Sequence, residues 1–330
     1  MADYKNIKGF NIQYLDSDPP NPIEGQMWFN STSQTLKGAE AGGAPAGTWA
    51  SGGSLNTGRY AGGGFGTQTA ALAFGGPPSP GFTELYNGSA WTEVNDLNTG
   101  RLAFSGFGTT TAGLAIGGET TANLSNVESW DGTNWTEITD IPATTRSMSA
   151  FGIQTSGIIA GGKPPGGTTG NAYSWNGTSW TTISSLGQSR SDAMASGTSS
   201  SNGILAGGET PAGPTTYANT ESWNGSAWTE LNDLNQARAY GGSATNSPNN
   251  GMLVFGGAAS ATVPLYANTE FFNGTSWTEV NDLATARRSG AKAGASTSSA
   301  LYAGGYSTAT QSVTEEWSAP DILVKTFTTS

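Results

Sequence analysis

The sequence has no cysteine and no histidine among its 330 residues. Zinc sites built on these ligands, thiol nucleophiles and catalytic pairs of serine or cysteine with histidine are therefore excluded. Charged residues are also scarce, at 11% of the chain, and the formal net charge is −11. Because binding to phosphates needs clustered lysine and arginine, we expect no nucleic-acid partner. We also expect no cofactor and no metal site.

Long hydrophobic runs are missing as well. The first eight residues have no apolar core of the kind found in a signal peptide, and no later run is long enough to span a membrane, so we expect no membrane insertion. No window keeps an apolar face at helical spacing. The chain is instead rich in glycine, with 49 residues, and in small polar residues. This composition predicts an all-β fold with almost no helix.

A repeat runs through most of the chain. A tryptophan recurs at spacings of 42 to 49 residues, each copy is followed by an arginine, and each arginine is followed by a short apolar run that ends in Gly-Gly. A period of this length with four strand-sized pieces is typical of a β-propeller. The tryptophans are Trp49, Trp91, Trp135, Trp180, Trp228 and Trp277.

Each unit divides into four predicted strands. The first follows the arginine and is rich in small residues, the second is the apolar run, the third carries Glu-x-aromatic, and the fourth starts at the tryptophan. An apolar residue after the fourth strand recurs in every copy, and we expect it to pack between blades. These residues are Leu55, Leu97, Ile141, Leu186, Leu234 and Leu283.

The number of copies predicts how the ring closes. Five units are complete, whereas the sixth ends near Trp317 without its fourth-strand tryptophan, which Trp49 can supply. An N-terminal strand that completes the last blade would remove a free sheet edge. We therefore predict a six-bladed β-propeller over residues 47–318, with four antiparallel strands per blade.

The flanking segments do not fit the repeat. Residues 1–46 form a predicted N-terminal arm, in which residues 25–38 are expected to make a β-hairpin with its turn at residues 30–34. The arm has two interpretations: an attachment or oligomerisation segment, or a strap packed on the propeller. Residues 319–330 are predicted to be a C-terminal strand or tail.

The repeat resembles that of the kelch family of β-propellers, which has an arginine before the inner strand, a hydrophobic run ending in Gly-Gly, a Glu-x-Tyr and a tryptophan at similar offsets. The chain departs from that pattern where Trp130, Trp175, Trp223 and Phe272 replace the usual tyrosine. The hairpin sequence Gly-Gln-Met-Trp-Phe-Asn-Ser-Thr and the C-terminal Glu-Glu-Trp also resemble proteins of marine tailed phages. That resemblance implies a place on a fibre or another virion appendage.

Two sets of residues are candidates for ligand binding. A ring of guanidinium groups at the mouth of the channel could hold a carboxylate or sulfate, although each arginine could instead pair with the third-strand glutamate inside its blade. Loops between the Gly pair and the third strand vary most and are the expected place of recognition. The candidates are Arg59, Arg101, Arg146, Arg190, Arg238 and Arg287 in the ring, and Phe82, Tyr217, Tyr266 and Tyr306 in the loops.

These features predict a non-enzymatic binding or structural module on the surface or an appendage of a phage particle. Its expected partners are other virion proteins, through the arm, and a host-surface glycan or protein, through the variable loops. A homo-oligomer is left open. The alternative is a carbohydrate-active enzyme, a glycan hydrolase or lyase, that uses carboxylates at the channel mouth.

Overall fold

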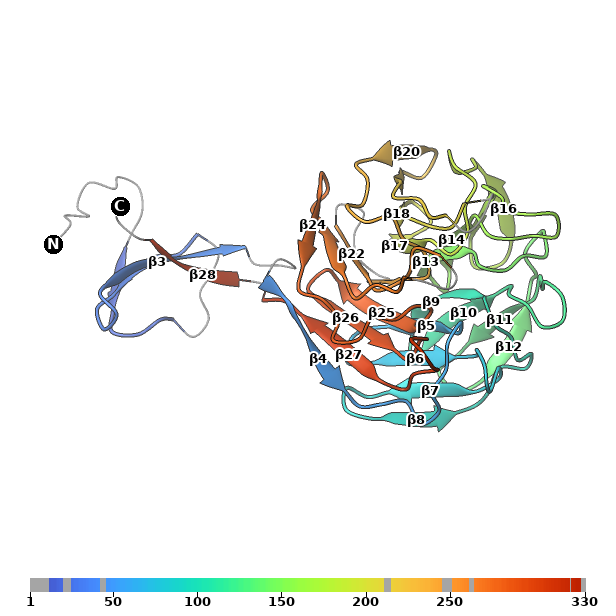
Figure 1. The fold of residues 1–330 in the computed structure, drawn as a ribbon, viewed down its shortest axis with the longest axis horizontal. Coiled ribbons are helices and arrows are strands. Elements are labelled where there is room, and N and C mark those ends of the chain that lie inside the picture. Colours follow the sequence, from blue (N-terminus) through green and yellow to red (C-terminus); the bar gives the residue numbers. More distant parts are fainter. Residues whose placement is uncertain are drawn as a thin grey trace.

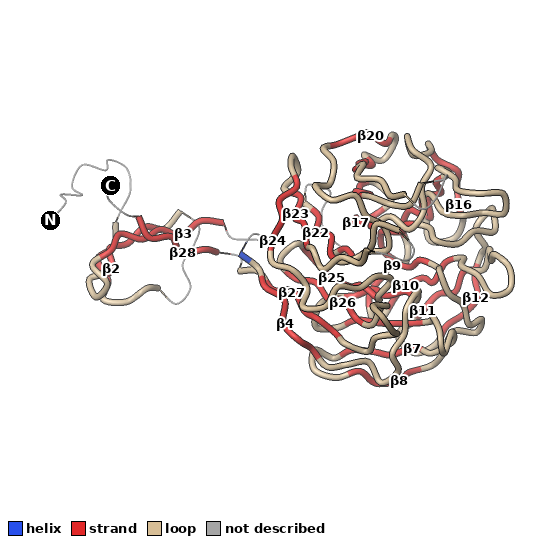
Figure 2. Tube along the Cα trace, in the orientation of Figure 1, coloured by secondary structure: helices blue, strands red, loops and turns tan. Residues whose placement is uncertain are grey.

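The computed structural model describes residues 12–19, 25–41, 46–210, 215–244, 251–260, 264–320 and 322–327. Over these ranges the secondary structure consists of short strands joined by loops and turns (Figure 2). None of the described residues belongs to a helix long and apolar enough to cross a membrane. The predicted all-β class is confirmed.

Six four-stranded antiparallel sheets are built from the repeats. Their strands, from the inner to the outer edge, are β5 (Gly63–Gly66), β6 (Ala71–Phe74), β7 (Thr83–Tyr86) and β8 (Trp91–Val94); β9 (Ser105–Thr109), β10 (Ala112–Ile116), β11 (Val127–Trp130) and β12 (Trp135–Ile138); β13 (Ser149–Ile153), β14 (Ser156–Ala160), β15 (Ala172–Trp175) and β16 (Trp180–Ile183); β17 (Met194–Ser199), β18 (Asn202–Ala206), β19 (Thr220–Trp223) and β20 (Trp228–Leu231); β21 (Gly242–Ser243), β22 (Met252–Phe255), β23 (Thr269–Phe272) and β24 (Trp277–Val280); and β25 (Ala291–Ser296), β26 (Ser299–Ala303), β27 (Thr314–Ser318) and β4 (Thr48–Gly52).

The inner strands of these six sheets surround a common axis. Each of β5, β9, β13, β17, β21 and β25 contacts the next, and β25 contacts β5 to complete the circle (Figure 1). In the last sheet β4 pairs antiparallel with β27, with Trp49 opposite Trp317. The predicted closure by an N-terminal strand is confirmed.

Packing between neighbouring sheets explains the small residues of the repeat. A phenylalanine on one inner strand lies against a glycine on the second strand of the next sheet, where a Cβ would come within 3.0 Å of its ring. The pairs are Phe65 with Gly113, Phe107 with Gly157, and Phe151 with Gly203. The apolar residue after each fourth strand is buried too, as Leu97 is among Phe65, Phe74 and Phe104. It packs between blades, as predicted.

Substituting Gly113 by alanine is therefore expected to destabilise the protein by about 1–3 kcal/mol, because the new methyl group overpacks the contact with Phe65. Gly81 is the matched control, since the nearest atom to a Cβ at that position is 3.8 Å away. Urea denaturation of Gly113→Ala and Gly81→Ala measures the difference. Equal free energies of unfolding for the two variants would contradict this account of the packing.

The described residues form seven four-stranded sheets, so the predicted number of six is wrong. The seventh has the order β1-β2-β3-β28 and consists of β1 (Gln13–Leu15), β2 (Met27–Asn30), β3 (Thr35–Ala41) and β28 (Ile322–Phe327). The hairpin of β2 and β3 is the predicted one. The C-terminal segment was missed as its partner, because β28 pairs with β3 across almost the whole length of the chain.

This seventh sheet stands beside the ring rather than over it (Figure 1). Within it the Asp18 carboxylate accepts hydrogen bonds from Trp28 Nε1 at 3.0 Å, Asn30 Nδ2 at 2.7 Å and Lys37 Nζ at 2.6 Å. The described part of the arm is thus a small sheet with polar contacts of its own. Residues 1–11, 20–24 and 42–45 of the predicted arm, and residues 321 and 328–330 of the predicted tail, lie outside the described residues.

Candidate functional site

A belt of backbone hydrogen bonds surrounds the mouth of the channel. One residue in each blade adopts the left-handed conformation, with φ between 52° and 62°, and its N–H donates to the carbonyl of its counterpart in the preceding blade. The six N···O distances are 2.6–2.9 Å, and the circle is closed. The belt residues are Ala61, Ala103, Ser147, Asp192, Tyr240 and Ser289.

Five of the six candidate arginines do not face this channel. Arg101 is typical: its side chain is fully buried and paired with Glu128 of the same blade, and its guanidinium donates to the carbonyls of Gly117 at 3.1 Å and Asn126 at 2.9 Å. Glu128 also accepts the backbone N–H of Asn98 at 2.7 Å. The same buried pairing joins Arg59 to Glu84, Arg190 to Glu221, Arg238 to Glu270 and Arg287 to Glu315.

The proposed ring of ligand-binding guanidiniums is therefore wrong for these five arginines. Each of them pairs with the third-strand glutamate inside its blade, as the alternative interpretation predicted, and so holds the segment between two blades in place. Because these five guanidiniums are buried and paired, a ligand cannot reach them unless the blade opens.

Arg146 is the exception, and it does not occupy the position of the other five. The second glycine of each Gly pair donates to the carbonyl of the arginine, as Gly76 N does to Arg101 O at 2.9 Å, but Gly118 N donates to Thr145 O. Thr145 is buried in that place, and Tyr173 stands where the other blades have glutamate.

The sequence contains a signal that Arg146 lies one position later than the other arginines, and the prediction missed it. The buried apolar residue precedes the arginine by four positions in five copies, as Leu97 precedes Arg101, but Ile141 precedes Arg146 by five. The extra residue moves Arg146 out of the blade. Its side chain is 38% exposed and pairs with Glu119, whose side chain is 22% exposed.

Arg146 lies in a hollow between two of the predicted variable loops. Residues 119–123 form one wall and residues 163–168 the other, and the volume enclosed is about 610 Å³. Asn123 Nδ2 donates to the carbonyl of Lys163 at 2.6 Å and so joins the two loops. The lining is polar apart from Ala122 and two prolines, Pro164 and Pro165.

The four candidate aromatics of the loops are half-buried rather than freely displayed. Tyr217 lies under the guanidinium of Arg190 with 5.8 Å from Cζ to the ring centroid, and Tyr266 lies under Arg238 at 5.6 Å. The carbonyl of Phe82 accepts a hydrogen bond from Arg59 Nη1 at 2.6 Å. Tyr306 packs on Tyr60, at 5.3 Å between ring centroids, and on Arg288. Three of the four thus contact the buried arginine of their own blade.

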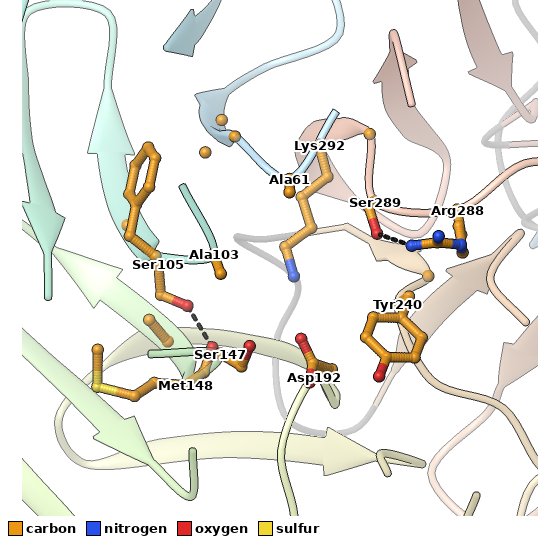
Figure 3. Close-up of a pocket in the computed structure, with 18 of the residues that line it drawn as sticks. Ala61, Ala103, Ser105, Ser147, Met148, Asp192, Tyr240, Arg288, Ser289 and Lys292 are labelled. Atoms are coloured by element: carbon orange, nitrogen blue, oxygen red, sulfur yellow. Dashed lines mark hydrogen bonds between the residues drawn. The ribbon is translucent and has the colours of Figure 1, made fainter. Parts of the chain in front are cut away.

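Sequence reasoning missed a second cavity, on the channel axis. It encloses about 180 Å³ and runs inward from the belt. Most of its wall is glycine, alanine and serine, and the charged or titratable groups in it are Asp192, Tyr240, Arg288 and Lys292 (Figure 3). They come from three different blades, so no local sequence motif predicts that they lie together.

Three of these groups, Asp192, Tyr240 and Lys292, have shifted pKa values. Burial raises the pKa of Asp192 to about 6, an effect that the charge of Lys163 opposes, and burial lowers the pKa of Lys292 to about 8. Burial and the nearby charge of Asp192 raise the pKa of Tyr240. Asp192 Oδ2 is buried without a hydrogen-bond partner, 3.7 Å from Lys163 Nζ. The cavity thus keeps ionisable groups in an environment that disfavours their charges.

Asp192 should give the stability of the protein a distinctive pH dependence. Its pKa in the folded protein, about 6, lies above the ordinary value of 3.8 for an aspartate. Its contribution to stability is therefore fully present below pH 4 and is lost as the pH rises through 6. The loss is up to about 3 kcal/mol. Asp192→Asn is expected to abolish it and to be more stable than the native chain at pH 7.5. Urea denaturation from pH 3.5 to 7.5 measures both proteins, and parallel profiles would contradict the prediction.

No group of three or more acidic residues suited to hold a metal ion occurs in the part of the chain that the structure describes. The charged residues of the two cavities are mixed in sign. Lys163 connects the cavities, because it lines the hollow and pairs with both Glu209 and Asp192.

Comparison with known proteins bears on the fold. No family model and no curated protein matches the sequence. Among solved structures 427 chains match, and one of them, titled "Structure of YjhT", has a TM-score of 0.65 and 13% sequence identity, over 80% of this chain and 96% of the other. At this identity only the fold can be compared. Together with the repeated four-stranded antiparallel sheets, the likeness identifies the chain as a β-propeller.

Proposed function

We propose that this chain is a non-enzymatic propeller of the kelch type, carried on a phage fibre or another virion appendage, that binds a host-surface glycan. The observation that carries the proposal is the hollow of about 610 Å³ between residues 119–123 and 163–168. It lies where the third copy departs from the repeat, and variable loops on a rigid scaffold are a common place of recognition.

The chemistry of the hollow favours a glycan. Thr121, Asn123 and Thr168 offer hydroxyl and amide groups, and Arg146 and Glu119 add a charged donor and acceptor. Sugar hydroxyls need such mixed partners, while Pro164 and Pro165 give an apolar surface for a ring face. The position of the arm supports the virion part of the proposal, because a sheet beside the ring can attach the chain and leave its loops free (Figure 1).

The test is binding of the purified chain to a glycan array and to host cells. Replacing both Thr121 and Arg146 by alanine is expected to weaken binding at least about tenfold, the effect of losing one to two hydrogen bonds to a charged or polar partner. Thr308→Ala is the matched control, because Thr308 is exposed on a corresponding loop outside the hollow. Unchanged binding of the double variant, or no binding by the native chain to any glycan or cell, would refute the proposal.

A carbohydrate-active enzyme is the second candidate, favoured by one observation. Asp192 lines the axial cavity with a pKa of about 6, and a raised carboxyl pKa is a property of general acids. The second carboxylate that most glycosidases need would be Glu209, which is held by Lys163. Polysaccharide turnover by the purified chain that Asp192→Asn abolishes would establish this candidate in place of the first.

A further inference from the structure

The axial cavity holds a cation that the protein leaves without a partner. Lys292 belongs to the inner strand β25, and its ammonium extends into the cavity toward Asp192 (Figure 3). Within the described residues no carboxylate forms an ion pair with Lys292 Nζ, and no acceptor receives a hydrogen bond from it. Lys292 is half-buried, so its ammonium has lost part of its hydration and has gained no partner in exchange. Partial burial of an unpaired charge costs free energy, and a bound anion would offset that cost.

The other charged groups that line the cavity, Asp192 and Arg288, are oriented differently. The Arg288 guanidinium is turned toward Ser289 (Figure 3). Its Cζ lies 5.7 Å from the ring centroid of Tyr240 and 5.3 Å from that of Tyr306, and its Nε is buried without a hydrogen-bond partner. Asp192 is 3.7 Å from Lys163 Nζ. Lys292 is the cation whose side chain extends into the cavity, where an incoming molecule would meet it (Figure 3).

The volume of the cavity and the charges in it restrict which molecule can bind. The volume of about 180 Å³ is several times the roughly 30 Å³ that a water molecule takes up in the liquid, so it suits a small organic group. A dianion such as phosphate would be repelled by Asp192, whereas a single carboxylate balances Lys292. Ser147 and Ser289 of the belt and the Asp192 side chain offer donors and acceptors for hydroxyl groups.

We propose that the axial cavity binds the carboxylate of a small hydroxylated acid, with Lys292 as the residue that pairs with the carboxylate and Asp192 as a neighbour that limits the ligand to one negative charge. This site is separate from the hollow between residues 119–123 and 163–168. It does not depend on the proposed function, because its argument rests on Lys292 and the cavity alone.

Calorimetric titration of the full chain at pH 7 with sodium glucuronate tests the proposal, with glucose as the neutral counterpart. We expect glucuronate to bind and glucose to bind at least tenfold more weakly. Lys292→Met should weaken glucuronate binding at least tenfold, while Asp192→Asn should strengthen it. Lys37→Met, in the separate arm sheet, is the control and should leave it unchanged.

Two further measurements keep the outcome clear. Urea denaturation shows whether Lys292→Met is folded. Removal of a half-buried charge without a partner should leave the variant at least as stable as the native chain. The affinity for an oligosaccharide that ends in glucuronate is compared with the affinity for free glucuronate. Tighter binding of the oligosaccharide points to the end of a glycan as the source of the carboxylate, and tighter binding of the free acid points to a free metabolite. Absence of binding by either acid, equal binding of glucose, or unchanged binding by a folded Lys292→Met would overturn the proposal.

Discussion

Replacing Arg101 by methionine is expected to lower the free energy of unfolding by about 3–5 kcal/mol, because Glu128 is then left as an uncompensated buried charge. Both side chains of the pair have 0% exposure, so water cannot take the place of the guanidinium. The variant also loses the hydrogen bonds from the guanidinium to the carbonyls of Gly117 and Asn126. Urea denaturation at neutral pH measures the change.

Arg146→Met is the matched control, since the same change is made to an arginine whose side chain is 38% exposed. An ion pair of this kind contributes about 0–1 kcal/mol. The double variant Arg101→Met with Glu128→Leu should be less unstable than the sum of its single changes. It should still be less stable than the native chain, because the backbone N–H groups of Asn98 and Thr99 lose their acceptor. Similar effects of Arg101→Met and Arg146→Met would show that the buried pair is not what joins the blades.

The third copy supports this account of the pair as a unit. There Thr145 and Tyr173 occupy the two places together, and neither a lone arginine nor a lone glutamate is left inside the blade. Losing both partners avoids the unbalanced charge that would follow from losing one. The arginine that follows Thr145 is thereby free to line the surface hollow.

Replacing Trp49 by alanine is the second change with a large expected effect, a loss of about 3 kcal/mol. This is the lower end of the range for truncating a tryptophan in a core, because Trp49 is only partly buried. Trp49 packs on Trp317 and Phe255, with ring centroids at 5.5 Å and 4.9 Å, and its Nε1 donates to Thr269 Oγ1 at 3.0 Å. These contacts hold β4 in the last blade. Loosening β4 exposes the edge of β27, so the variant should also aggregate.

Trp180→Ala is the control that distinguishes loss of ring closure from loss of an ordinary tryptophan contact. Trp180 has the corresponding place on the fourth strand of another blade and packs on Trp175 at 4.9 Å, but its strand follows β15 directly in the chain. Truncation there should destabilise the protein without opening the ring. Urea denaturation and sedimentation velocity would follow both variants, and equal aggregation of the two would argue against a special role for β4.

The propeller repeat, its four strands and the closing strand were all predictable from the sequence, because each is a local pattern that recurs. The apolar runs became the buried second strands, and Trp49 took the place that the sixth copy lacked. The number of sheets was not predictable, since β28 pairs with a strand that lies about 280 residues earlier. Nothing in either segment alone shows that the other is its partner.

The candidate site depended far more on the tertiary structure. By itself the sequence determined which residues repeat, and so it indicated a common role for Arg101 and its counterparts. It did not show whether that role was an ion pair inside the blade or ligand binding at the channel mouth. Only the fold decided it, by placing a glutamate from the third strand against each buried guanidinium and by moving Arg146 to the surface. The axial cavity was decided by the fold alone. Asp192 and Tyr240 occupy two of the six equivalent belt positions, which converge on one axis whatever side chains they carry. Lys292 reaches the same axis from the inner strand β25.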